Sequence, residues 1–238
     1  MLNVRYSVFN LFEERTYVAW RDAGRCVIID PGCREGAELD ALEGLLAQEG
    51  LKPVAILLTH GHLDHILGVK ALQDRYGIPV HMHPADTAAL DYNRVMAERF
   101  RMKLPGEFTW TPLADGQQLE IADMRFEVIA TPGHTPGCVC FLEREEGVLF
   151  TGDTLFAGSI GRTDFPYSEY DDEIHSILEK LLPLDPGTAV LPGHGPASTI
   201  GRERTGNPFL EPFNEPEEEQ EEELDPVVIR REGELGPN

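Results

Sequence analysis

The densest group of histidines in the chain lies in THGHLDH, residues 59–65, directly after the apolar run VAILL. His60 and His62 are two positions apart, so in extended backbone their side chains project to the same side. A helix would send them to different faces, which excludes the i, i+4 pattern of helical zinc sites. Asp64 and His65 follow at the expected start of a helix and point elsewhere. One loop can therefore serve two metal ions about 4 Å apart.

Three further residues of metal-binding type each lie in a turn just after a strand-like run. They are His134 in ATPGHTPG, Asp153 in LFTGDTLF and His194 in VLPGHGP. A single histidine is usually an ordinary surface residue, but three turns that repeat one pattern favour a shared role. The sequence therefore predicts that these side chains complete the metal site from the ends of other strands.

Short strand-like runs and amphipathic helical segments alternate through residues 1–210. Runs such as TYVAWR, RCVIID and FEVIA are typical of strands, and residues 37–49 have apolar positions at helical spacing before Gly50. Helices are also expected over residues 65–77 and 168–184. Strands in runs, with helices between them, predict a mixed α/β layered domain.

The composition changes near Leu210. Residues 211–238 are rich in Glu and Pro and contain eleven acidic and two basic residues. Such a segment buries too little apolar surface to offset the entropy cost of ordering it. We therefore predict one folded domain at residues 1–210 and a disordered acidic tail at residues 211–238. VVIRR, residues 227–231, is the one piece of the tail with enough apolar character to dock elsewhere.

The overall charge argues against nucleic acid and membrane partners. The formal net charge is −22 at pH 7, and a strongly negative surface repels nucleic acids and anionic membranes. The start of the chain lacks the pattern of a signal peptide, and no apolar run approaches the ~20 residues that span a bilayer. We therefore expect a cytoplasmic protein whose four cysteines are reduced thiols.

Together, THGHLDH, TPGHTPG, FTGDTLF and LPGHGP, in that order and spacing, resemble the metal-binding motifs of the metallo-β-lactamase fold superfamily. The early IIDPG, residues 28–32, resembles the first motif of that superfamily. The resemblance covers residues 1–210. It implies an α/β fold, the αββα sandwich, with the metal site at the edge of the two sheets.

Carried over position by position, the resemblance implies a set of seven metal ligands. The first metal ion would be bound by His60, His62 and His134. The second would be bound by Asp64, His65 and His194. Asp153 would bridge both ions, and Asp30 would hydrogen-bond the ligand loop, a role that affects metal affinity. Imidazole and carboxylate ligands without thiolate suit Zn(II), Fe(II) or Mn(II), and we expect two divalent ions, zinc before iron or manganese.

Such a site implies hydrolysis. A metal-bound water is deprotonated near pH ~7, and the resulting hydroxide could attack an electrophilic carbonyl. Asp64 would orient this hydroxide and could accept its proton. A thiolate suits the site as leaving group because it departs without help from a general acid. The sequence therefore predicts an enzyme with a dinuclear metal centre.

GDTLFAGSIGRTDFP and PGHGPASTIGRERTGNPFL resemble the glyoxalase II group, and more closely its short single-domain members. The resemblance implies hydrolysis of S-acyl thioesters such as S-D-lactoylglutathione, a small-molecule substrate. Full-length members bind the glutathione carboxylates through a basic C-terminal helical domain, and here an acidic tail stands in that region. Arg162 is then the expected anchor for a substrate carboxylate, and an ion pair with Asp164 is the alternative.

Two other functions remain open. Persulfide dioxygenases, which use a single iron, share the fold, the GHTPGC run and the GRTDF loop, but PGHGP around His194 is more similar to glyoxalase II. A nucleic-acid-processing member would need a basic face or an added substrate arm, and this acidic chain shows neither. A binding module without activity is disfavoured because all seven ligand positions carry ligand residues.

Overall fold

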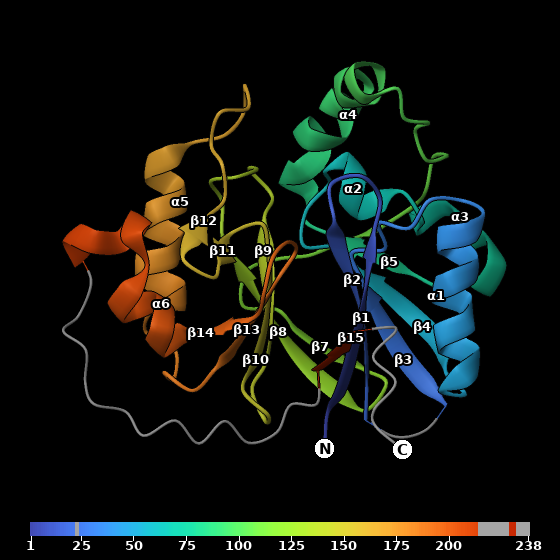
Figure 1. Ribbon diagram of the computed structural model, residues 1–238, viewed down its shortest axis with the longest axis horizontal. Coiled ribbons are helices and arrows are strands. Elements are labelled where there is room, and N and C mark those ends of the chain that lie inside the picture. Colours follow the sequence, from blue (N-terminus) through green and yellow to red (C-terminus); the bar gives the residue numbers. More distant parts are fainter. Residues whose placement is uncertain (22–23, 214–228, 232–238) are drawn as a thin grey trace.

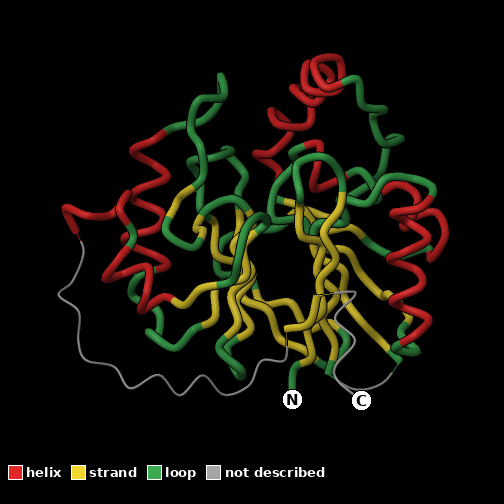
Figure 2. Tube along the Cα trace, viewed as in Figure 1, coloured by secondary structure: helices red, strands yellow, loops and turns green. Residues whose placement is uncertain are grey.

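The computed structural model describes residues 1–21, 24–213 and 229–231. Two β-sheets pack face to face, and helices cover the outer face of each sheet (Figures 1 and 2). This is the αββα sandwich that the resemblance implied. None of the helices within these residues is long and apolar enough to cross a membrane.

Each sheet mixes parallel and antiparallel neighbours. In the described part of the chain the first sheet has the order β15 (Ile229–Arg231), β1 (Asn3–Phe9), β2 (Glu14–Trp20), β3 (Arg25–Ile29), β4 (Lys52–Leu57), β5 (Val80–Met82) and β6 (Thr111–Pro112). The second has the order β14 (Ser198–Thr199), β13 (Ala189–Pro192), β10 (Val148–Gly152), β9 (Val139–Glu143), β8 (Met124–Ala130) and β7 (Gln118–Ile121). A small hairpin is formed by β11 (Leu155–Phe156) and β12 (Ser159–Ile160).

Strands that are apolar on both faces explain the four layers. In β2, Tyr17 and Ala19 enter the core between the sheets, whereas Val18 packs toward the outer helices. In β10 of the second sheet, Phe150 faces the first sheet, and Leu149 faces the helices that cover the outer side. Because successive side chains of a strand point to opposite faces, continuous apolar runs bury both faces of each sheet.

The helices cover the two outer faces and the edge that carries the loops. On the first sheet lie α1 (Ala37–Gln48) and α3 (Val69–Tyr76), and on the second lie α5 (Tyr170–Ser176), continued by η2 (Ile177–Leu181), and α6 (Ile200–Gly206) (Figure 1). The shorter α2 (Leu63–Ile66), with η1 (Pro84–Asp86) and α4 (Thr87–Phe100), lies above the end of the first sheet (Figure 1). The 3₁₀ segment η3 spans Pro208–Phe213.

One expected helix is broken in two. The sequence predicted a single helix over residues 65–77, but the structure has α2 and α3 with Gly68 between them. The backbone N–H of Gly68 donates to the carbonyl of Pro31 at 2.8 Å. A Cβ at this position would lie 2.5 Å from Sγ of Cys33, so the chain passes too close for any other residue. The periodicity of residues 65–77 could not show this tertiary contact.

The predicted tail lies mostly outside the described residues, but two parts of it are described. Residues 211–213 end η3, and Ile229–Arg231 form β15, which pairs in parallel with β1 through Val4 and Ile229. These six residues have regular secondary structure, and the rest of the predicted tail lies outside the described residues. They include the last part of VVIRR, the apolar stretch of an otherwise polar segment, and a free edge at β1 offers it backbone partners.

Candidate metal centre

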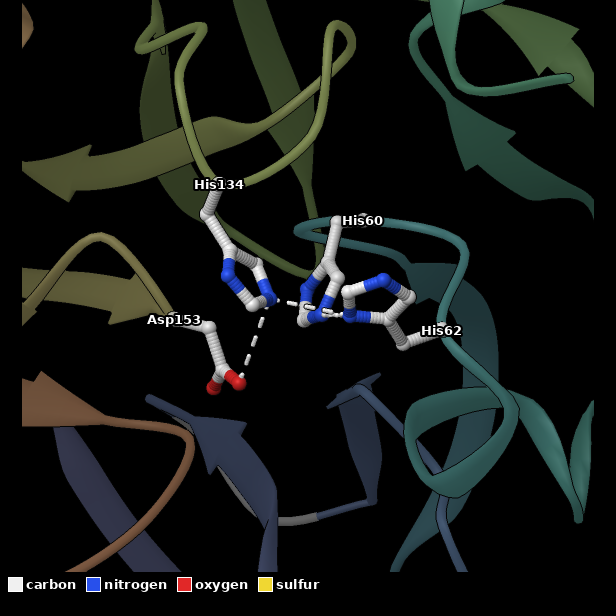
Figure 3. Close-up of side chains that lie close together, drawn as sticks. All are labelled: His60, His62, His134 and Asp153. Carbon is white, nitrogen blue, oxygen red and sulfur yellow. Dashed lines mark hydrogen bonds and ion pairs between the residues drawn. The ribbon is translucent and has the colours of Figure 1, made fainter. Parts of the chain in front are cut away.

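Four loops gather the proposed ligands at one edge of the sandwich. They follow β4 and β8, β10 and β13, so both sheets contribute. After β4 the chain bends at Thr59, and His62 has extended backbone, at φ −65° and ψ 150°, just before α2 begins. The rings of His60 and His62 point into the same space, where His134 and Asp153 meet them from the other sheet (Figure 3).

The first group of side chains contains His60, His62, His134 and Asp153. Nδ1 of His62 lies 3.0 Å from Nε2 of His60 and 2.9 Å from Nε2 of His134. Oδ2 of Asp153 lies 3.5 Å from the same nitrogen of His134 (Figure 3). Three ring nitrogens and one carboxylate therefore face one point, in surroundings where all three rings are buried.

The second group contains Asp64, His65 and His194. Nε2 of His194 lies 3.3 Å from Nε2 of His65 and 3.3 Å from Oδ2 of Asp64. Asp153 also reaches this group, with Oδ1 3.4 Å from Nε2 of His65 and Oδ2 3.6 Å from Nε2 of His194. A Cβ at Gly193 would lie 2.5 Å from Oδ1 of Asp153, so only glycine fits there. Asp153 thus lies between the groups, and all the proposed ligands come together.

Backbone carbonyls fix the protonation of two of the rings. Nδ1 of His134 donates to the carbonyl of Arg162 at 2.7 Å, and Nδ1 of His194 donates to that of Phe12 at 3.0 Å. A carbonyl only accepts hydrogen bonds, so the proton of each neutral ring is on Nδ1. The Nε2 atoms, which face the site, therefore carry lone pairs.

Asp30 fixes two more rings. Its Oδ2 accepts from Nδ1 of His65 at 3.1 Å and from the hydroxyl of Thr59 at 2.5 Å. Because the Thr59 proton is used on Asp30, its oxygen is left to accept from Nδ1 of His60 at 3.0 Å. Asp30 has a left-handed φ of 49°, a conformation that aspartate tolerates better than most residues. It also accepts from the backbone N–H of Thr59 at 2.7 Å and so holds the ligand loop.

In their neutral forms, at least four histidine rings therefore direct a nitrogen lone pair into the site. A hydrogen bond between two of these nitrogens would require one of the two rings to be a protonated imidazolium ion. In the described part of the chain, the buried Oδ1 of Asp153 has no hydrogen-bond partner. Cations satisfy imidazole nitrogens and carboxylate oxygens together, so these residues fit divalent metal ions. Zinc, iron and manganese all accept such a ligand set.

The pKa shifts divide the site into a neutral and a charged part. Burial lowers the pKa of His60, His62 and His134, which keeps these rings neutral and able to bind a metal. Burial also lowers the pKa of His65, but the carboxylates of Asp153 and Asp64 outweigh it and raise that pKa well above its ordinary value. The second group therefore has the stronger electrostatic coupling between carboxylates and rings.

Two buried carboxyl groups that no sequence pattern predicted hold the ligand loops. Asp86, at the end of η1, accepts hydrogen bonds from the backbone N–H groups of Gly61 and Gly137. Glu173 of α5 accepts from the backbone N–H of His134 at 2.7 Å. In the sequence both look like ordinary acidic residues of helical segments, and no local pattern marks them.

Arg162 lies exposed on the loop after β12 and has an internal partner. Its Nε and Nη2 each lie 2.6 Å from a carboxylate oxygen of Asp164. The guanidinium group also stacks over the ring of Phe165, 4.9 Å from its centre. The ion pair that the sequence left open is therefore present, and Arg162 contacts the metal site through its backbone carbonyl.

The same loop places aromatic rings against the first group, which the sequence did not predict. The ring centre of Phe165 lies 4.7 Å from that of His62 and 5.7 Å from that of His134. The phenol oxygen of Tyr167 lies 2.7 Å from Nε2 of His62. An aromatic residue in a Pro-containing loop carries no signal for this role.

Comparison with known proteins identifies the family. A family model described as the metallo-beta-lactamase superfamily matches residues 12–194. Hydroxyacylglutathione hydrolase GloC of Haemophilus influenzae is 36% identical over 214 residues, which cover 88% of this chain and 98% of that protein. The structure of BLEG-1 B3 metallo-beta-lactamase has a TM-score of 0.78 at 38% identity and matches 88% of this chain and 99% of that chain. A protein solved in a di-iron-bound form has a TM-score of 0.76 at 38% identity, covering 84% of this chain and 97% of that chain.

Proposed function

The chain belongs to the metallo-beta-lactamase superfamily, and on that premise we propose that it is an enzyme that hydrolyses S-acyl thioesters of the S-D-lactoylglutathione type. The observation that carries the proposal is the match to hydroxyacylglutathione hydrolase GloC, which extends over 98% of that protein. Little of that relative lies outside the match, so the activity in its name needs no domain beyond the region shared with this chain.

The proposed metal centre holds two divalent ions in the two groups of ligands, with Asp153 as the shared ligand. Such ions supply Lewis acidity and make a nearby water acidic near neutral pH. Asp64 is the proposed proton acceptor, and its Oδ2 lies in the second group, 3.3 Å from Nε2 of His194. Burial raises the pKa of Asp64, but the charge of His65 outweighs it, so this carboxyl stays ionised. A thiolate leaving group then departs without a protonated side chain.

Arg162 remains in the proposal as the anchor for a substrate carboxylate. Its guanidinium group is exposed, and its partner Asp164 is exposed as well. A surface ion pair of this kind contributes little, ~1 kcal/mol or less, so a substrate carboxylate can compete with Asp164 for the guanidinium group. A small anionic thioester fits this arrangement better than a nucleic acid, given the net charge of −22.

Hydrolysis of β-lactams is a second candidate, because BLEG-1 B3 metallo-beta-lactamase matches at 38% identity over 99% of its chain. A β-lactam and a thioester are both attacked at a carbonyl carbon. They differ in the leaving group, which is an amine nitrogen in one and a thiolate in the other. Oxidation of a persulfide at a single iron stays the third possibility from the sequence.

One set of assays on the purified, metal-analysed protein tests these functions. We expect S-D-lactoylglutathione and related thioesters to release free thiol under anaerobic conditions, with turnover abolished by a chelator. His60→Ala should lose the activity, whereas His175→Ala, which changes an exposed histidine of α5, should keep it.

The competing functions give different results in the same set. Oxygen uptake and sulfite production from glutathione persulfide, without thioester turnover, would show that the protein is a persulfide dioxygenase and not a thioesterase. Faster turnover of a chromogenic β-lactam than of any thioester would show that the protein is a β-lactamase instead.

The role of Arg162 is tested by comparing acidic and neutral thioesters in wild type and Arg162→Ala. A KM increase limited to the acidic thioesters would support Arg162 as the anchor for a substrate carboxylate.

A further inference from the structure

His62 differs from the other histidines of the site in its outward partner. Backbone carbonyls fix the tautomers of His134 and His194. The Asp30 carboxylate fixes that of His65, and the Thr59 hydroxyl, whose proton is donated to Asp30, fixes that of His60. Nε2 of His62 instead lies 2.7 Å from the hydroxyl of Tyr167, which can either donate or accept a hydrogen bond. The tautomer of His62 is therefore set by what this hydroxyl does.

Only one of the two arrangements allows His62 to bind a metal with the nitrogen that faces the site. That nitrogen is Nδ1, which lies 3.0 Å from Nε2 of His60 and 2.9 Å from Nε2 of His134. If Tyr167 donated to Nε2, a neutral His62 would carry its proton on Nδ1 and block that position. If Tyr167 accepts from Nε2–H, Nδ1 is a lone pair directed into the site.

The ring of Tyr167 is held firmly enough for its oxygen to act as a fixed acceptor. It stacks on Phe165 with an interplanar angle of 7° and a centre distance of 5.8 Å, and it meets the edge of Tyr92 at 5.7 Å. The loop is tied down next to it. Ser168 donates its hydroxyl to the carbonyl of His134 at 2.6 Å, and the N–H of Glu169 donates to the carbonyl of Gly133 at 2.9 Å.

We propose that Tyr167 is a positioning residue of the metal centre, whose phenol oxygen accepts from Nε2–H of His62 and holds Nδ1 toward the first metal ion. The loop of residues 161–168 then supplies outward acceptors for two ligands, through the carbonyl of Arg162 for His134 and through Tyr167 for His62. The proposal rests on the metal centre proposed above but not on the identity of the substrate.

The test uses Tyr167→Phe, which keeps the stacked ring and removes only the oxygen. Partners of this kind change metal affinity by roughly 10- to 100-fold, so we expect zinc at the first group to dissociate that much more readily. Affinity is measured by competition with a chromophoric chelator on protein first stripped of metal. Tyr92→Phe is the matched control. It removes a hydroxyl from the ring next to Tyr167, and Tyr92 has no contact with His62 among the described contacts. Its affinity should equal that of wild type.

A spectroscopic measurement separates this role from general packing. In the zinc-loaded wild type, histidine ¹⁵N NMR should show His62 protonated on Nε2 and bound through Nδ1, and the exchange of that proton should accelerate in Tyr167→Phe. An affinity within about threefold of wild type, or a zinc-loaded His62 protonated on Nδ1, overturns the proposal. Wild type that binds no zinc overturns the metal centre itself, whereas zinc binding without thioester turnover overturns only the proposed substrate.

Discussion

Asp153 has the most demanding position of any single residue, because it touches both groups of ligands. Its two oxygens lie 3.4 to 3.6 Å from ring nitrogens of His65, His134 and His194. Burial would raise the pKa of Asp153, but the neighbouring His194 and His65 hold it well below its usual range. The carboxylate therefore stays charged, as a ligand shared by two cations requires.

Loss of this carboxylate should reduce metal content and activity together. In Asp153→Ala two positive ions would lose the anion between them, so we expect fewer than two metal ions per chain and a loss of turnover of at least ~100-fold, since even outer hydrogen-bond partners cost 10 to 100-fold. Metal content is measured by elemental analysis after dialysis. Asp172→Asn, which changes an exposed carboxyl of α5, serves as the control. Two ions per chain in Asp153→Ala would contradict the bridging role.

The 3₁₀ segment η1, just before α4, holds two of the ligand loops through hydrogen bonds. The carboxylate of Asp86, just before α4, connects the loop of Gly61 with that of Gly137. A Cβ at Gly137 would lie 2.6 Å from Cβ of Asp86, so glycine is required for this close approach. Asp86 is buried and its oxygens accept from two different N–H groups, which one amide oxygen cannot replace.

Replacing Asp86 should cost stability in a pH-dependent way. Burial raises the pKa of Asp86 to about 6, so the folded state favours the protonated form, and the part of the stability that comes from this shift is lost as pH rises from about 4 to 6. Near neutral pH, Asp86→Asn should destabilise the metal-free protein by roughly 1–3 kcal/mol, because one of the two buried N–H groups loses its acceptor. The difference from wild type should be larger at pH 4 by up to about 3 kcal/mol, the equivalent of two pKa units.

The measurement is urea unfolding of both proteins at pH 4, 5, 6 and 7. Because the difference between variant and wild type is compared, groups that titrate alike in both proteins cancel. A destabilisation that stays constant, or that grows with pH, would show that burial does not disfavour the charged form of Asp86.

At the scale of the whole molecule, the site depends on both sheets packing correctly. Ligands from the first sheet meet ligands from the second only across the edge of the sandwich, so no single half of the chain can form the centre. The C-terminal part adds β15 beside residues Val4 to Tyr6, at the start of β1. Phe12, which binds His194, follows the opposite end of that strand.

We therefore propose that the domain folds and works without residues 214–238. Ending the chain after Phe213 keeps the buried Leu210 and removes β15. A few backbone hydrogen bonds of a short edge strand contribute about 1–3 kcal/mol, so the free energy of unfolding should fall by no more than that. Turnover should stay within about twofold of the full chain, which steady-state kinetics would show. A larger loss of either would mean that the C-terminal segment supports the catalytic edge.

The layered α/β fold and the residues that gather at its edge could be predicted from the sequence. Spacing of two in extended backbone, and ligand types placed just after strands, are local features, so they could be read without coordinates. Three features depend on tertiary contacts instead. They are the helix break at Gly68, the hydrogen bonds from Asp86 and Glu173 to the ligand loops, and the contact between Tyr167 and His62. Each joins segments far apart in the chain, and which of many acidic or aromatic side chains makes such a contact depends on how the layers pack.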